Sequence, residues 1–222
     1  EYLSKKYNLK EPQIIHVDSY PTIEIIENLK SNLKTSKFEL IIAIGGGSVL
    51  DSAKVLSVFL DNNVHDNLNK VIENPDILDK AEKVQLHVFP TTAGTGAEVT
   101  QFATIWDFKK NKKHSLDHQK LLPDEYFLEE KFLETLQGQN LLYPFLDSIS
   151  HAFESLWNKN RNNESVKYAI DSLNLNLKSL KAFCSKDEMY DFEKMILASN
   201  FAGKAINITR TSIAHSISYP LT

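Results

Sequence analysis

Two side chains of metal-ligand type, Asp147 and His151, stand four residues apart in the stretch LDSISHAFES (146–155). Apolar residues recur there at helical spacing, which predicts a helix with Asp147, His151 and Glu154 together on a second face. Pro144 just upstream suits the first turn of that helix. A carboxylate and an imidazole one turn apart form either an ordinary surface hydrogen bond or half of a metal site. Both alternatives stay open here, because two ligands do not hold a metal.

Two glycine-rich loops could bind a nucleotide, and each follows a run of residues typical of a buried strand. The first, AIGGGSVLDSAK (43–54), precedes a helix whose free N–H groups and positive dipole end favour a phosphate. Its alternative is a tight turn with Ser48 as N-cap and Asp51 completing a capping box. The second, PTTAGTGAEVT (90–100), offers hydroxyl donors beside two glycines, or is a plain loop of turn-forming residues. Together they favour a ligand crevice at one edge of a sheet.

The elements that position these residues change in type along the chain. Strands are expected at 12–17, 38–44 and 83–89, helices at 21–35 and 48–60, a polar loop at 61–70, and a hairpin formed by 99–108 and 113–116. After about residue 129 the sequence predicts helices only. We therefore expect an α/β dinucleotide-binding domain over 1–128, with a parallel sheet and flanking helices, and an all-helical domain over 129–222. The opening EYLSKKYNL reads as part of a helix, and the chain is expected to be an internal fragment of a longer protein.

The composition is that of an ordinary globular protein, with 42% hydrophobic residues, 24% charged residues and a net charge of −4. The 25 basic and 29 acidic residues form no basic stripe, so no nucleic-acid partner is expected. No apolar run approaches a membrane span and no signal peptide opens the chain, so no membrane partner is expected. The single cysteine, Cys184, fits a reducing compartment, and we expect a cytoplasmic location.

Four ordered motifs carry a resemblance to a known family. GGGSVLDSAK, PTTAGTGAEVT, DSISHAFES and AGKAINITRTSIAHSISYPL occur in the order seen in the iron-containing alcohol dehydrogenases, which the chain resembles over nearly its whole length. The resemblance implies a dinucleotide-binding domain followed by a helical domain that holds a divalent metal, Fe²⁺ or Zn²⁺. It further implies NAD or NADP as cofactor, a small aldehyde or alcohol as substrate, and a homodimer.

The resemblance also implies roles for individual residues. For the cofactor, it implies that the glycine turn contacts the pyrophosphate, threonines line the nucleotide, a lysine reaches the ribose and an apolar residue lies near the adenine. The implied cofactor-binding residues are Gly46, Gly47, Ser48, Asp51, Thr91, Thr92, Thr95, Thr100, Phe102, Lys113 and Phe132. For the metal, it implies Asp147, His151 and His215 as three of four ligands, the fourth being expected beyond Thr222. Seen alone, His215 reads more readily as a buried core histidine.

One position departs from the usual pattern of the family. Many members carry a second histidine four residues after the third ligand, and this chain has Tyr219 there. We predict a catalytic role for Tyr219, as a proton donor or as a hydrogen-bond donor to an anionic substrate group. The ending HSISYPLT resembles the branch of phosphonoacetaldehyde reductases or hydroxyethylphosphonate dehydrogenases.

The expected activity is hydride transfer by a metal-dependent, NAD(P)-linked alcohol dehydrogenase or aldehyde reductase. Two alternatives remain at this level. One is an enzyme of the glycerol dehydrogenase or dehydroquinate synthase type, which shares the glycine turn and a metal cleft. The other is a non-catalytic nucleotide-binding relative.

Overall fold

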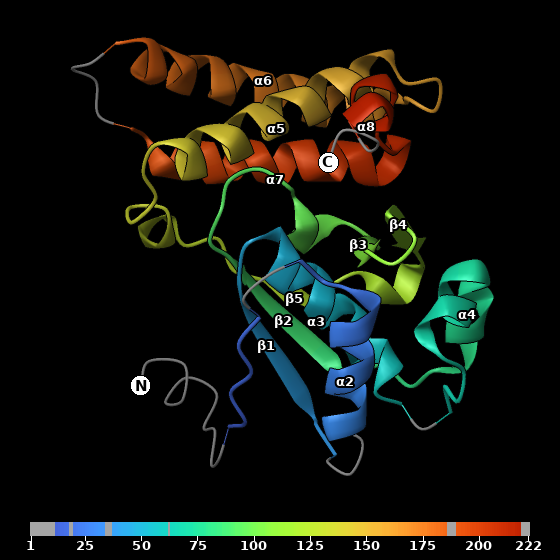
Figure 1. The fold of residues 1–222 in the computed structure, drawn as a ribbon. Coiled ribbons are helices and arrows are strands. Elements are labelled where there is room, and N and C mark those ends of the chain that lie inside the picture. Colours follow the sequence, from blue (N-terminus) through green and yellow to red (C-terminus); the bar gives the residue numbers. More distant parts are fainter. Residues whose placement is uncertain (1–11, 18–19, 34–36, 62, 186–189, 219–222) are drawn as a thin grey trace.

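The computed structural model describes residues 12–17, 20–33, 37–61, 63–185 and 190–218. Its first half contains a small parallel sheet and its second half a layer of helices, which Figure 1 shows above the sheet. The helix expected within residues 1–9 lies outside the described residues.

The parallel sheet brings the carboxyl ends of two strands together. It has the order β1-β2-β5, with β1 Leu40–Gly45, β2 Gln85–Pro90 and β5 Glu125–Tyr126. β1 and β2 pair in register from Leu40 opposite Gln85 to Gly45 opposite Pro90. The two glycine-rich loops therefore leave the sheet side by side.

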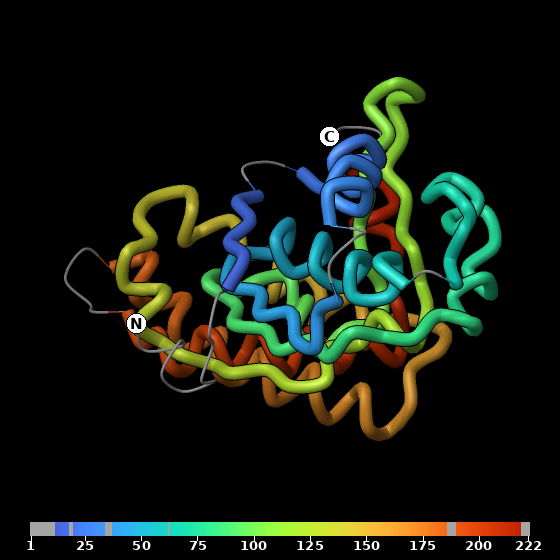
Figure 2. Tube along the Cα trace, turned by 90° about the horizontal axis from the view of Figure 1, so that it is seen from below, coloured from blue at the N-terminus to red at the C-terminus, as the bar shows by residue number. Residues whose placement is uncertain are grey.

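The helix α3, Gly47–Phe59, packs against this sheet, and two further helices and a hairpin pack against α3 or beside one another. These are α2 Ile23–Leu33, α4 Leu68–Glu73, and the antiparallel strands β3 Phe102–Asp107 and β4 Lys112–Asp117. The hairpin lies beside α2, where the tip residue Lys109 pairs with Glu24 at 2.9 Å. Viewed from below, its light green tip extends beyond the helices (Figure 2). The expected hairpin is thus confirmed.

The helical layer consists of α5 Gln139–Trp157, α6 Asn163–Cys184, α7 Phe192–Thr209 and the short α8 Ile213–Ser218. α5, α6 and α7 pack against one another (Figure 1). The start of α6 is fixed by a capping box, because Asn162 accepts from the Ser165 amide while Ser165 accepts from the Asn162 amide. Within the described residues every strand ends by Tyr126, which agrees with the expected change from strands and helices to helices alone. The domain boundary at 128/129 stays a prediction.

Three local expectations were wrong. Residues 12–17 form no strand and are mostly exposed, because no strand among the described residues pairs with them. Residues 68–70 of the expected polar loop are helical, since Asn67 caps α4 and Leu68, the first residue of that helix, is buried. α5 begins at Gln139, five residues before Pro144, because Leu141 and Phe145 extend its buried face upstream. Pro144 therefore lies inside the helix and removes one helical hydrogen bond there.

No described helix combines the length and the apolar character needed to cross a membrane.

Candidate metal and cofactor site

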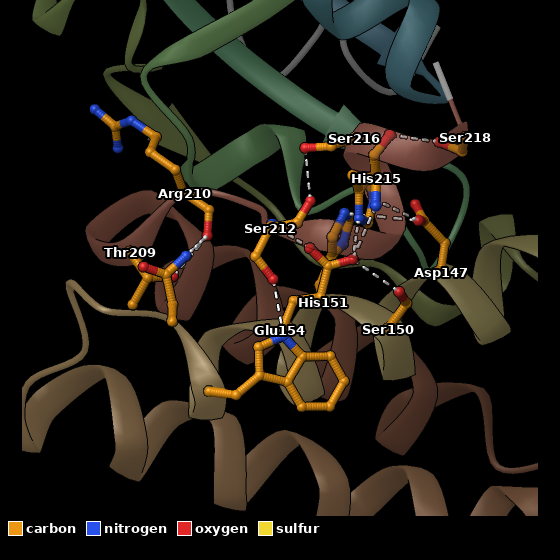
Figure 3. Close-up of polar contacts among 12 residues, drawn as sticks. Asp147, Ser150, His151, Glu154, Thr209, Arg210, Ser212, His215, Ser216 and Ser218 are labelled. Atoms are coloured by element: carbon orange, nitrogen blue, oxygen red, sulfur yellow. Dashed lines mark hydrogen bonds and ion pairs between the residues drawn. The ribbon is translucent and has the colours of Figure 1, made fainter. Parts of the chain in front are cut away.

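Three potential metal ligands meet between α5 and α8. Asp147 and His151 lie one turn apart on α5, and His215 reaches them from α8 (Figure 3). The Oδ1 atom of Asp147 is 3.6 Å from His151 Nε2 and 3.3 Å from His215 Nε2. The three ligand atoms all lie within 4.8 Å of one another. The two imidazole rings stack, with centroids 4.6 Å apart and 16° between their planes.

These separations suit a shared ion. Two ligand atoms bound at about 2.1 Å to one tetrahedral metal stand about 3.4 Å apart. Asp147 offers a carboxylate oxygen and the histidines offer nitrogens, a donor set that suits Fe²⁺ or Zn²⁺. The structure thus brings together the three residues that the sequence predicted as ligands, while metal binding itself stays a prediction.

The outer nitrogens of the histidines explain why a cation is needed. His151 Nδ1 donates to the Gly94 carbonyl at 3.2 Å, and His215 Nδ1 donates to Glu154 Oε1 at 2.7 Å. Because the Nδ1 atom of each neutral imidazole carries the proton, its Nε2 atom presents a free lone pair. Two lone pairs and the Asp147 carboxylate then face one another, and only a cation, either a metal ion or an added proton, makes that arrangement favourable.

Glu154 is the main supporting residue of the cluster. Its buried carboxylate accepts from His215 Nδ1, from the His215 amide at 3.1 Å, and from the Ser212 amide. It therefore fixes both the His215 ring and the start of α8 (Figure 3). Helical spacing predicted Glu154 on the ligand face of α5 but indicated no function for it, because its partners lie about sixty residues further along the chain.

The charges of the site favour a neutral His151 and an ionised Asp147, the states that bind a metal, but a protonated His215. Burial lowers the pKa of His151, against the opposing effect of Asp147, and so favours the neutral ring. Burial would raise the pKa of Asp147, but His151 and His215 outweigh it and keep this carboxyl ionised. For His215, burial is outweighed by its hydrogen bonds to Asp147 and Glu154, which raise its pKa and favour a bound proton when no metal is present.

The glycine turn, residues 45–47, and the loop 90–100, here called the threonine loop, pack directly against each other at the start of α3. A Cβ atom added to Gly46 would come within 3.3 Å of Thr92 Cγ2, and one added to Gly47 within 2.8 Å of Thr95 Cγ2. Gly46 is the N-cap of the thirteen-residue α3, whose first N–H groups have no partner within the helix. The capping box of Ser48 and Asp51, the alternative interpretation of this stretch, is not formed: no side chain caps α3, and Asp51 Oδ2 accepts from the Thr104 amide at 2.8 Å.

The threonine loop also touches the helical layer. A Cβ added to Gly94 would come within 2.6 Å of Pro144 Cα in α5. Gly96, at φ 61°, lies so close to Gly203 of α7 that an added Cβ would be 2.4 Å from the Gly203 Cα. The loop predicted to bind the nucleotide, residues 90–100, thus packs between the sheet and the helices α5 and α7.

The remaining predicted cofactor residues occupy different surroundings. Thr100 is buried, and its hydroxyl contacts Lys54 Nζ at 2.9 Å. The Phe102 ring is partly buried, with the Arg210 guanidinium 5.6 Å from its centroid. Burial lowers the pKa of Lys113 on β4, while Asp147 and Asp51 oppose that shift, so its charge interacts with α3 and with the candidate ligand Asp147.

Phe132 lies after β5 and packs against the core cluster that also includes Ala93 of the threonine loop. It ends the 3₁₀ turn η4, Glu130–Phe132, and packs partly buried against the core of the helical layer. Tyr219 lies outside the described residues. The predicted contacts of the cofactor residues and the role of Tyr219 therefore stay predictions.

Two cavities lie away from the ligand cluster. One of about 380 Å³ opens between α2 and the hairpin and includes Glu24 and Asp107 in its lining. The other, of about 290 Å³, lies where β5 meets α6 and α7 and includes Tyr126 and Lys204. Neither is lined by a predicted site residue, so the site is defined by its donor atoms and loops.

Comparison with known proteins gives two family matches. Residues 5–129 match the model of the iron-containing alcohol dehydrogenases, and residues 142–222 match the model of the C-terminal region of that family. A phosphonoacetaldehyde reductase of Streptomyces viridochromogenes is 31% identical over 96% of this chain and 55% of its own length. A 4-hydroxybutyrate dehydrogenase of Clostridium kluyveri is 28% identical over 98% of this chain and 55% of its own. The chain spans about half the length of these relatives.

Solved structures share the fold. An iron-containing alcohol dehydrogenase of Thermotoga maritima superposes with a TM-score of 0.89 and 24% identity, covering 100% of this chain and 59% of its own. A sulfoacetaldehyde reductase of Bifidobacterium kashiwanohense, solved in complex with NAD⁺, gives a TM-score of 0.82 and 24% identity. That match covers 92% of this chain and 54% of the reductase. The expected fold class, a parallel sheet with flanking helices followed by a helical region, is confirmed.

Proposed function

The chain belongs to the iron-containing alcohol dehydrogenase family, and on that premise we propose that it forms part of a metal-dependent, NAD(P)-linked alcohol dehydrogenase or aldehyde reductase. The proposed reaction transfers a hydride between a nicotinamide and a small aldehyde or alcohol. The proposal extends to one divalent ion per chain, a homodimer, and the division into a dinucleotide-binding part and a metal-binding part near residue 129.

One observation carries this proposal. The Gly94 carbonyl, in the middle of the threonine loop, accepts from the Nδ1 atom of the candidate ligand His151 at 3.2 Å. A hydride-transfer enzyme that uses a metal must hold cofactor and metal beside one substrate. The direct contact between the predicted nucleotide loop and the predicted metal ligands supplies that proximity.

The chain's own residues then have separate tasks. Asp147, His151 and His215 would hold the divalent ion, and Glu154 would keep the His215 ring in place. The first N–H groups of α3, behind the glycine turn, would face the cofactor pyrophosphate. When bound, the metal supplies Lewis-acid polarisation of a carbonyl oxygen and the nicotinamide supplies the hydride.

For the substrate we propose a small aldehyde, with phosphonoacetaldehyde as the first compound to assay. The relative that is 31% identical is named a phosphonoacetaldehyde reductase, and the ending HSISYPLT supports the same branch. Tyr219 is proposed to donate a proton or to hydrogen-bond the anionic group of this substrate.

The test of the activity uses the full-length protein. NADH and NADPH oxidation is followed with phosphonoacetaldehyde and with an uncharged aldehyde, and bound Fe and Zn are measured in the same samples. We expect turnover that depends on metal and is lost in His151→Ala, with the exposed His65→Ala as control. Metal-replete protein that oxidises neither cofactor with either aldehyde would contradict the proposal, and glycerol oxidation would favour the alternative enzyme type.

Tyr219→Phe separates the two proposed roles of this tyrosine. Loss of a proton donor should lower kcat for every aldehyde, by roughly tenfold to a thousandfold. Loss of a substrate hydrogen bond should instead raise KM for phosphonoacetaldehyde and spare uncharged aldehydes. Wild-type kinetics on both kinds of substrate would remove Tyr219 from the site.

A further inference from the structure

Lys54 is a fully buried cation on α3, with no exposed side-chain surface. Its Nζ atom lies 3.3 Å from Asp51 Oδ1, 2.9 Å from Thr100 Oγ1 and 3.0 Å from the Phe102 carbonyl. An ammonium group has three N–H donors, and each of these three acceptors can take one. Burial lowers the pKa of Lys54, while Asp51 favours its charged form.

These bonds connect two different parts of the predicted cofactor site. Lys54 and Asp51 belong to α3, which begins at the glycine turn. Their partners lie in 100–104, because Lys54 binds Thr100 and the Phe102 carbonyl while Asp51 Oδ2 accepts from the Thr104 amide. The segment 100–104 leads into the hairpin whose second strand carries Lys113. Three hydrogen bonds between buried or partly buried groups thus set the position of the hairpin on the cofactor helix.

The next buried acid extends the connection to the helical layer. Glu98, at the end of the threonine loop, is buried and accepts from Asn200 Nδ2 of α7 at 3.0 Å. Lys54 also lies close enough to Glu98 for their charges to interact. Lys54 therefore hydrogen-bonds Asp51 of α3 and interacts electrostatically with Glu98 of the threonine loop, which in turn is bonded to α7.

We propose that Lys54 is a positioning residue for cofactor binding. Its ammonium fixes the segment 100–104 on α3 and holds the Asp51 carboxylate in one orientation, which keeps Phe102 and Lys113 in place relative to the glycine turn. The inference rests on the proposed function, because it assumes that a nicotinamide cofactor lies across this turn. Lys54 itself is enclosed by protein and touches neither cofactor nor substrate.

The test compares two variants of the full-length protein that both alter the buried part of α3. Lys54→Met keeps the length of the side chain but removes its charge and all three hydrogen bonds. Val58→Ala, one turn further along, leaves a cavity in the core but removes no hydrogen bond to the segment 100–104, so it controls for lost stability. NADH and NADPH dissociation constants, bound metal and the unfolding temperature are measured for both.

We expect Lys54→Met to weaken cofactor binding by roughly tenfold to a hundredfold, as for the loss of charged hydrogen bonds, while metal content stays at the wild-type level. Val58→Ala should lower the unfolding temperature at least as much and bind the cofactor like wild type. Equal cofactor affinity in Lys54→Met and wild type would overturn the proposal, as would losses of metal and cofactor in parallel with stability. If Lys54→Met does not fold, Lys54→Gln, which keeps two N–H donors, takes its place under the same criteria.

The two proposals fail differently. Wild-type protein that binds neither NADH nor NADPH would contradict the proposed function, whatever the Lys54 variants do. Wild-type protein that binds a cofactor, together with variants that bind it equally well, would contradict only the role of Lys54.

Discussion

At the scale of single residues, the candidate metal site depends on a side chain and a backbone carbonyl that are not themselves candidate ligands. Glu154 is buried and receives the Nδ1 proton of His215, while the Gly94 carbonyl receives that of His151. These two hydrogen bonds orient the imidazole rings so that the Nε2 atom of each faces Asp147. A ligand set of one carboxylate and two imidazoles is therefore useful only because its outer hydrogen bonds are made.

Glu154→Gln tests this support. The amide keeps the size of the side chain but loses the charge that holds His215 Nδ1, so the ring is less well oriented. We expect metal affinity to fall about 10- to 100-fold, as is typical when an outer partner of a metal-binding histidine is removed. Competition with a metal-sensitive dye measures it, with Ser150→Ala, next to the same carboxylate at 3.4 Å, as control. Unchanged affinity in Glu154→Gln would mean that Glu154 only stabilises the fold.

At the scale of elements, the site is made where loops are compressed between the sheet and the helices. The glycine turn meets Thr92 and Thr95, and Gly96 meets Gly203, with almost no space for an added side chain. Such contacts hold α3, the threonine loop and α7 as one packed unit. The junction of α7 and α8 is strained in a different way. Arg210 has φ 67° and ψ 173° there, a backbone conformation that costs about 1–3 kcal/mol for residues other than glycine.

Gly46→Ala tests the turn as a cofactor site. The new Cβ would stand 3.3 Å from Thr92 Cγ2, tight but tolerable, and would project into the space between the two loops. We expect NADH and NADPH affinity to fall by about tenfold, equivalent to about 1.4 kcal/mol, with little loss of fold stability. Titration of both cofactors measures it, and Ser57→Ala, on the same helix away from the turn, should bind like wild type. Equal affinity in Gly46→Ala would make the turn structural only.

Two substitutions at Arg210 separate backbone strain from side-chain bonding. Both Arg210→Gly and Arg210→Ala remove the ion pair with Asp117, whose oxygen lies 2.7 Å from the Arg210 Nε atom. Only glycine also relieves the backbone. We expect Arg210→Gly to be more stable than Arg210→Ala by about 1–2 kcal/mol, the strain energy less the entropy of an unfolded glycine. Urea unfolding compares them, and an Ala variant at least as stable as the Gly variant would contradict the strain.

At the scale of the whole molecule, the two halves are joined through the site. His151 binds Gly94, Asn200 of α7 binds Glu98, and Asn207 of α7 accepts from the Gln101 amide at 2.9 Å. The threonine loop is therefore a shared structural element of the sheet and of the helical layer. A metal bound by α5 and α8 would stabilise the helical half and, through Gly94, this loop.

Removing the metal from the full-length protein should lower its unfolding temperature. A ligand that binds only the folded state at 100 times its dissociation constant adds about 2.7 kcal/mol of stability. Thermal unfolding is measured with chelator and then with Zn²⁺ or Fe²⁺ added back. His65→Ala should show the same metal-dependent shift as wild type, and His151→Ala should show little or none. An equal shift in His151→Ala would place the stabilising ion elsewhere.

The sequence by itself determined what depends on local spacing. The pitch of a helix places Asp147 and His151 on one face, and β-branched runs ending in glycines mark β1 and the turn into α3. Ordered motifs further indicated the family and His215 as a third ligand. These features need only residues that are close in the chain, or a pattern already known from relatives.

Only the tertiary structure decided which groups lie beside these residues. Glu154 and Ser212 are 58 residues apart, and Lys54 and Thr100 are 46 apart, so no local rule relates them. Pro144 lies within α5, and 12–17 pairs with no strand among the residues that the structure describes, because packing and strand partners override local preference. Contacts between distant residues form only when the elements pack, and in this protein those contacts orient the ligands and enclose the buried cation.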